Sequence, residues 1–188
     1  MIAAILENIA DHISTKNPLF NNYFGGAVQI RGDIESENFH IVVIDNKGKM
    51  TEVGIDNRRG NYFYIRNQTG IDYDHGAEAQ YTACDEASGT FEGRLVTYVK
   101  RGVQEKIINA ISSDLMSYRN TTITGVINAR VELTGVEVDF EQIYIDETGK
   151  PIPKAQPNVS LLAFDFNVNF VARSMKEGCL DREFCEPC

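Results

Sequence analysis

Three of the four cysteines in this chain of 188 residues lie within the segment CLDREFCEPC at residues 179–188. Cys185 and Cys188 have the two-residue spacing that zinc knuckles and redox-active dithiols share. A structural zinc site takes four ligands, whereas this segment supplies three thiols, Cys179 included, and no histidine. A redox pair belongs at the start of a helix, and this pair lies at the end of the chain. We therefore interpret the segment as a tail with free thiols; a metal site and a disulfide are the open alternatives.

Other chemistry-bearing residues do not converge on a catalytic pattern. His12, His40 and His75 fall far apart, in different predicted elements. The Gly-x-x-x-x-Gly-Lys-Ser/Thr, Gly-x-Gly-x-x-Gly and Gly-x-Ser-x-Gly patterns are absent from the sequence. Adjacent carboxylates occur only in predicted loops and do not converge on one substrate as an acid and a base must: Asp85 with Glu86, and Asp146 with Glu147. We expect a protein that is not an enzyme and that uses no cofactor.

Two amphipathic helices are predicted to frame the fold. The first covers residues 2–14, where Asn17-Pro18 stops it, and its apolar stripe consists of Ile2, Ile5, Leu6, Ile9 and Ile13. The second covers residues 103–118 and carries an apolar stripe of Val103, Ile107, Ile111, Leu115 and Tyr118. No capping side chain stands near Gly102, so the start of the second helix is not defined by the sequence.

Between the helices the sequence is typical of β-structure. Strands are predicted at residues 26–31, 39–44, 50–55, 61–66 and 93–101, and the second and third of these form a hairpin around Asp45-Asn-Lys-Gly. Residues 69–89 show little periodicity, which indicates a long surface loop.

After the second helix we predict one very long strand over residues 123–140. Its apolar residues change parity beside Gly135, and a slip of one residue at a glycine indicates a β-bulge. The alternative is two strands, or a hairpin kinked at Thr134-Gly135. Residues 144–158 contain three prolines and are predicted to be a loop. Residues 161–173 alternate regularly and are predicted to be a half-buried closing strand.

These elements predict an α+β fold: a mostly antiparallel twisted sheet flanked by the N-terminal helix and the second amphipathic helix. Residues 1–173 form a single domain in this interpretation, and residues 174–188 form the cysteine-containing tail. The net charge of −9 argues against nucleic acid as a bound partner, because phosphate binding needs clustered basic residues. Neither a signal peptide nor a membrane span is expected, so we place the protein in a cytoplasm before assembly.

Element order and two segments give the chain a resemblance to a known family. The segments are RLVTYV at residues 94–99 with the helix that follows, and LAFDFNVNF at residues 162–170. Over residues 1–173 the chain resembles the tail-completion or tail-terminator proteins of long-tailed bacteriophages and related neck proteins.

The resemblance implies a structural virion protein. Its subunits form a homo-oligomeric ring, usually of six, at the head-proximal end of the tail, where the ring terminates the tail tube and joins it to the head connector. DNA passes through the lumen without sequence-specific binding. The contact elements expected for such a ring are residues 135–140, the loop 144–158 and the second helix, with interface residues Gly135, Val136, Val138, Phe140, Tyr144, Ile145, Pro151 and Pro153.

Two other classes of function stay open. One is another phage structural subunit, namely a tail-tube, head-completion or baseplate protein. The other is a small ligand-binding or enzymatic α+β domain with a pocket between the helices and the sheet.

A chain truncated after Arg173 is expected to fold and assemble like the full-length chain, because the tail lies outside the predicted domain. Circular dichroism and light scattering on the two proteins provide the comparison. Loss of folding or of assembly in the truncated chain would show that the cysteine segment belongs to the fold.

Overall fold

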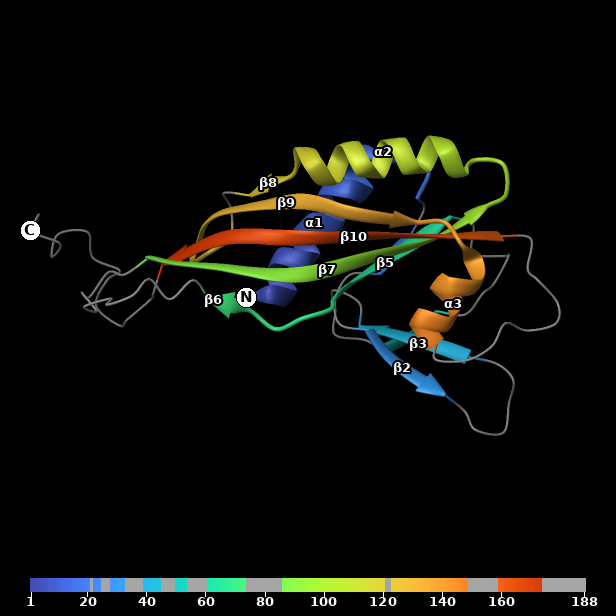
Figure 1. Ribbon diagram of the computed structural model, residues 1–188, viewed down its shortest axis with the longest axis horizontal. Helices are drawn as coiled ribbons and strands as arrows, with labels where there is room; N and C mark the ends of the chain where they lie inside the picture. The colour runs from blue at the N-terminus through green and yellow to red at the C-terminus, as the bar shows by residue number, and fades with distance from the viewer. Residues whose placement is uncertain are drawn as a thin grey trace, which may run out of the picture.

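The structure, a computed structural model, describes residues 1–20, 22–24, 28–32, 39–44, 50–53, 61–73, 86–120, 123–148 and 159–173. Within these ranges it confirms the predicted α+β class, with helices packed on a largely antiparallel sheet (Figure 1).

The main sheet has seven strands in the order β1-β5-β7-β10-β9-β8, and β6 pairs with β7 off this path. β1 runs parallel to β5 and every other pairing is antiparallel. The strands are β1 (Asn22–Phe24), β5 (Tyr62–Asn67), β6 (Asp72–Tyr73), β7 (Glu86–Lys100), β8 (Arg119–Asn120), β9 (Val126–Glu137) and β10 (Val159–Arg173). A separate sheet of three strands contains the predicted hairpin; its strands are β2 (Val28–Gly32), β3 (Phe39–Ile44) and β4 (Met50–Val53).

β7 is longer than predicted, and it occupies part of the segment predicted to be a surface loop. It pairs with β10 along its whole length, from Lys100 opposite Val159 to Glu86 opposite Arg173. Two glycines made the first part of this strand hard to predict from the sequence, because glycine is depleted in strands. Gly93 lies opposite Phe166 and Gly89 opposite Phe170, and the two phenylalanine rings fill the space that a Cβ would need. β6 also falls in the predicted loop, whereas residues 74–85 lie outside the described residues.

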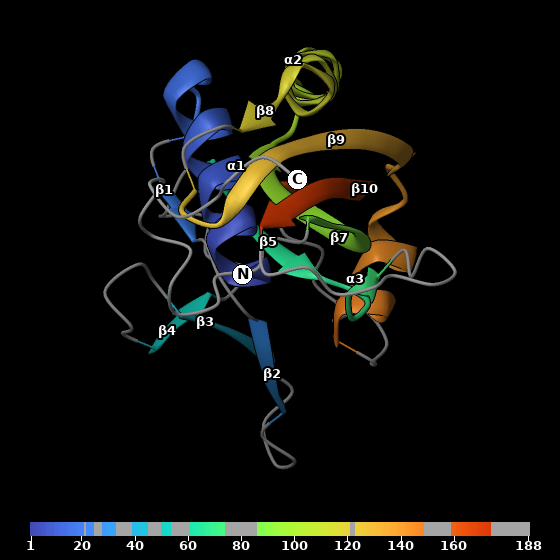
Figure 2. The same ribbon diagram turned by 90° about the vertical axis from the view of Figure 1, so that its left-hand side faces the viewer.

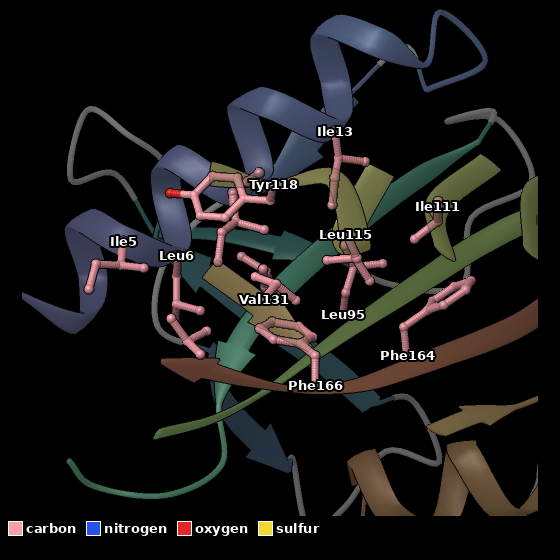
Figure 3. Packing of buried hydrophobic residues seen from close by; sticks show 14 of the residues in the cluster. Ile5, Leu6, Ile13, Leu95, Ile111, Leu115, Tyr118, Val131, Phe164 and Phe166 are labelled. Carbon is pink, nitrogen blue, oxygen red and sulfur yellow. The ribbon is translucent and has the colours of Figure 1, made fainter. Parts of the chain in front are cut away.

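α1 (Ile2–Lys16) and α2 (Gln104–Ser117) cover one face of the sheet, and the predicted stripes are buried there except for Ile2 and Val103, which are partly buried. Figure 3 shows Leu6 of α1 pointing down toward the sheet and Ile13 of α1 lying above Leu115 of α2, in the same cluster as Phe166 of β10. The alternating side chains of β10 are buried on this face as predicted: Leu162, Phe164, Phe166, Val168, Phe170 and Ala172. No side chain caps the start of α2, in agreement with the sequence.

β9 runs from Val126 to Glu137, so it is shorter at both ends than the predicted strand. Its register with β10 shifts between the pairs Phe166–Leu133 and Asp165–Gly135, which leaves Thr134 without an opposite residue. The predicted strand end at Phe140 is wrong because Asp139 begins a helix instead. The Asp139 carboxylate accepts hydrogen bonds from the backbone N–H groups of Glu141 and Gln142, which is helix capping.

The helix that starts there, α3 (Phe140–Thr148), also corrects the prediction of a loop from residue 144. α3 lies on the face of the sheet opposite α1 and α2 (Figure 2). Residues 149–158 of the predicted loop lie outside the described residues.

Hydrogen bonds and an ion pair join α1 to α2 and to Tyr118, the residue after α2. The Tyr118 hydroxyl donates to Asn8, and Lys16 donates to Ser117 and lies 3.8 Å from Asp114. His12 packs edge-on against the Tyr118 ring at 5.4 Å, and its buried Nε2 has no hydrogen-bond partner among the described residues. Burial, assisted by Lys16 and opposed by Asp114, lowers the pKa of His12.

The lowered pKa of His12 predicts a loss of stability in acid. The neutral imidazole is favoured in the folded chain, so its stabilisation is complete above the ordinary pKa of 6.5 and is lost as the pH falls through the folded pKa. The free energy of unfolding, from urea titrations between pH 7.5 and about pH 5, should therefore fall more in the wild type than in His12→Gln. Equal slopes for the two proteins would contradict this role of His12.

Candidate functional site

The structure places six of the eight predicted interface residues at one end of the sheet (Figure 1). Gly135 and Val136 belong to β9, Val138 to the link after it, and Phe140, Tyr144 and Ile145 to α3. Pro151 and Pro153 lie outside the described residues.

Three of these six residues are exposed apolar side chains. Val138 is 58%, Ile145 38% and Val136 37% exposed. Tyr144, in contrast, is only 4% exposed, and its ring stacks on that of Phe140 with the ring centroids 6.1 Å apart. Tyr144 belongs to a second hydrophobic cluster between α3 and the sheet, and the partly buried Phe140 packs against that cluster.

Among the described strands, none pairs with the outer edge of β9 at the same end, although α2 runs alongside β9 on that side (Figures 1 and 2). β10 pairs with its inner side, and β8 pairs only with Ala129 and Arg130 on its outer side. Within the described residues no strand pairs with the outer side of residues 131–137. None of the side chains from Glu132 to Glu137 is buried. An open strand edge presents unpaired backbone N–H and C=O groups to other chains.

Beneath α3 lies a buried ionic cluster centred on Glu147, whose side chain is 2% exposed. The Arg66 guanidinium binds both carboxylate oxygens, with Nη2 at 2.7 Å from Oε1 and Nε at 3.1 Å from Oε2. The Tyr64 hydroxyl donates to Oε2 at 2.7 Å. Such a bidentate, charge-assisted contact fixes both position and orientation, and here it fixes α3 on β5.

Arg94 of β7 is the second cation of the ionic cluster and is 7% exposed. Its Nε lies 3.5 Å from carboxylate oxygens of Glu147 and of Asp165, and its Nη1 lies 3.4 Å from Asp146. The Nε atom makes no well-aligned hydrogen bond among the described residues. Arg94 is thus surrounded by three carboxylates, yet it is less completely bonded than Arg66.

Tyr64 and Tyr98 stay protonated. Burial, reinforced by Tyr98 and Glu147, raises the pKa of Tyr64 well above its ordinary range. Burial likewise raises the pKa of Tyr98. Tyr64 is therefore a hydrogen-bond donor to the carboxylate, and the ionic cluster as a whole holds α3 in place.

An open hollow of about 470 Å³ lies at the other end of the strands, beside β6. Its charged lining residues are Asp72 and Arg130, and the others include Thr90, Asn128 and Asn169. The alternative of a ligand-binding or enzymatic domain predicted a pocket between the helices and the sheet. The main hydrophobic core fills that space.

No group of three or more metal-binding side chains is found in the described part of the chain. Cys179, Cys185 and Cys188 lie outside that part, so the free-thiol, metal and disulfide alternatives all stay open. None of the described helices is long and apolar enough to cross a membrane.

Comparison with known proteins adds no family. No family model matches the chain, and no curated protein matches it significantly in sequence.

The ionic cluster was not predicted from the sequence, although the positions of its two arginines could have indicated it. Arg66 ends the otherwise apolar segment Tyr62-Phe-Tyr64-Ile-Arg66, and Arg94 begins the largely apolar segment Arg94-Leu-Val96-Thr-Tyr98. An arginine on a buried strand face requires an acidic partner. The partner, Glu147, lies 81 residues from Arg66 in the sequence, and no local pattern connects them.

Glu147→Ala is expected to lower the free energy of unfolding by about 2–3 kcal/mol, because it removes the bidentate partner of half-buried Arg66 and the acceptor of the buried Tyr64 hydroxyl, whereas Arg94 keeps Asp146 and Asp165. The matched control is Glu141→Ala, an exposed acidic residue in the first turn of the same helix, which should cost less than about 1 kcal/mol. Chemical denaturation of the three proteins measures both. Similar losses in the two variants would refute the anchoring role of Glu147.

Proposed function

We propose that this chain is a ring-forming structural subunit of a phage tail, which terminates the tail tube at its head-proximal end and joins it to the head connector. The observation that carries the proposal is the outer edge of β9 at residues 131–137, with which no described strand pairs, together with the exposed side chains of Val136 and Val138. A free edge and exposed apolar side chains at one end of a sheet favour association with another chain.

The presence of two different edges on the sheet favours a ring over a two-fold dimer. The sheet has two different edges, β1 at one side and β9 with β8 at the other. Contacts between unlike surfaces of identical subunits are heterologous, and they close into rings when the rotation per subunit permits. Strand addition at such an edge gives affinity through main-chain hydrogen bonds.

The net charge of −9 fits a ring through which DNA passes, because an acidic wall repels the phosphates and does not retain them. The element order gives further support: an N-terminal helix, a β-rich section, and two long strands around a central helix. The second candidate is a tail-tube subunit, which shares the sheet and the ring but also stacks into filaments.

Light scattering and negative-stain images of the purified protein test the proposal. Closed rings of uniform subunit number support a terminator, and open filaments support a tube subunit. A protein that stays monomeric at high concentration and also fails to bind isolated tail tubes would refute both.

Within an assembling protein, Val138→Arg is expected to raise the concentration needed for assembly by about tenfold, equivalent to about 1.4 kcal/mol. The charge would have to be desolvated in an apolar contact. The control is Ile127→Arg, at the opposite end of β9 from Val138 and 40% exposed. Equal effects of both variants would place the contact elsewhere.

A further inference from the structure

The groups that hold Glu147 belong to the sheet and not to α3. Tyr64 and Arg66 lie on the same face of β5, and Arg94 lies directly opposite Arg66 on β7. Backbone pairing fixes these positions: Tyr64 pairs with Val96, and Arg94 pairs on its other side with Asp165. The three donors are thus oriented before α3 contacts them.

The charges of the sheet alone leave an excess of one positive charge at this place. Arg66 and Arg94 carry two, and among the groups that contact them only Asp165 is an acid of the sheet, because Asp146 and Glu147 come from α3. Asp165 is itself engaged by Gln68, which donates to it at 3.0 Å. The sheet alone therefore has one positive charge without a partner here, and α3 balances it with Glu147, while its second acid, Asp146, contacts only the Nη1 atom of Arg94.

A second observation points the same way. Arg94 is more than nine-tenths buried, and its Nε has no aligned hydrogen bond even with Glu147 present. A buried, charged donor without a full partner costs free energy. The nearest acceptors are Glu147 Oε1 and Asp165 Oδ1, both at 3.5 Å.

We propose that Tyr64, Arg66 and Arg94 form a carboxylate-binding site of the sheet, of which Glu147 is the built-in occupant. The ligand class is a monocarboxylate on a short aliphatic chain, because the occupant's stem is buried beside the second hydrophobic cluster. A dianion such as sulfate fits poorly, since Asp165 lies against Arg94 and repels a second negative charge. A carboxylate that competes with Glu147 releases α3 and uncovers that cluster. This inference does not depend on ring formation.

The test is rescue of Glu147→Ala by sodium acetate and sodium propionate. Tm is measured at pH 7 against rising carboxylate, with sodium chloride keeping the ionic strength constant. We expect a saturable rise in Tm, and a folding constant about elevenfold higher at ten times the dissociation constant. Wild type should show no such rise, because Glu147 fills the site.

Two controls make the result specific. The double variant Glu147→Ala with Arg94→Met should lose most of the rescue, and sodium sulfate should rescue Glu147→Ala less than acetate does. Acetate no better than chloride, or an equal rise in the double variant, would overturn the site. Sulfate as effective as acetate would overturn the assignment to monocarboxylates.

Should Glu147→Ala fail to fold in chloride, the yield of soluble protein on refolding in acetate replaces the Tm. A higher yield in acetate than in chloride supports the site, and equal yields overturn it.

Discussion

Two arginines placed directly opposite each other on neighbouring strands are the constraint on which this structure depends. Arg66 and Arg94 face each other across β5 and β7, on the face of the sheet away from α1 and α2. Like charges in opposite positions destabilise a sheet, and burial increases the cost. A shift of either strand by one residue would move its arginine into the main core. The pairing is therefore tolerable only with a carboxylate above it, and Glu147 supplies one by bringing α3 onto this face.

The two faces of the sheet are consequently unequal. α1 and α2 cover one face with a continuous core, whereas α3 covers only one end of the other, over Tyr62, Tyr98 and Leu161. A helix of nine residues is not stable alone in water, so α3 forms because the cluster and the ionic contacts hold it. Beyond α3 the same face carries Asn167 and Asn169, which is why β10 alternates between apolar and polar residues from Phe164 to Phe170, whereas Leu161 and Ala163 are buried near α3.

Elements with a long, regular period could be predicted from the sequence, whereas those decided by distant partners could not. α1, α2 and β10 follow their apolar spacing closely. α3 was hidden because Val136, Val138 and Phe140 also alternate like a strand. Its helical signal, an apolar face of Phe140, Ile143 and Tyr144 behind the Asp139 cap, competed with that alternation. The partners of Glu147 depend on strand register, which a single sequence does not specify.

One row of residues joins the ionic cluster to the open edge of β9. Arg66, Arg94, Asp165 and Gly135 stand side by side on four successive strands. The row ends at Gly135, where a Cβ atom added to the glycine would have no neighbouring atom within 4 Å. The register of β9 shifts at that residue, and the exposed Val136 and Val138 follow it. A chain that pairs with this edge would therefore be separated from Asp165, which contacts Arg94, only by β9. The proposed assembly surface and the anchor of α3 are thus neighbouring parts of one sheet, which gives association and α3 docking a physical route to influence each other.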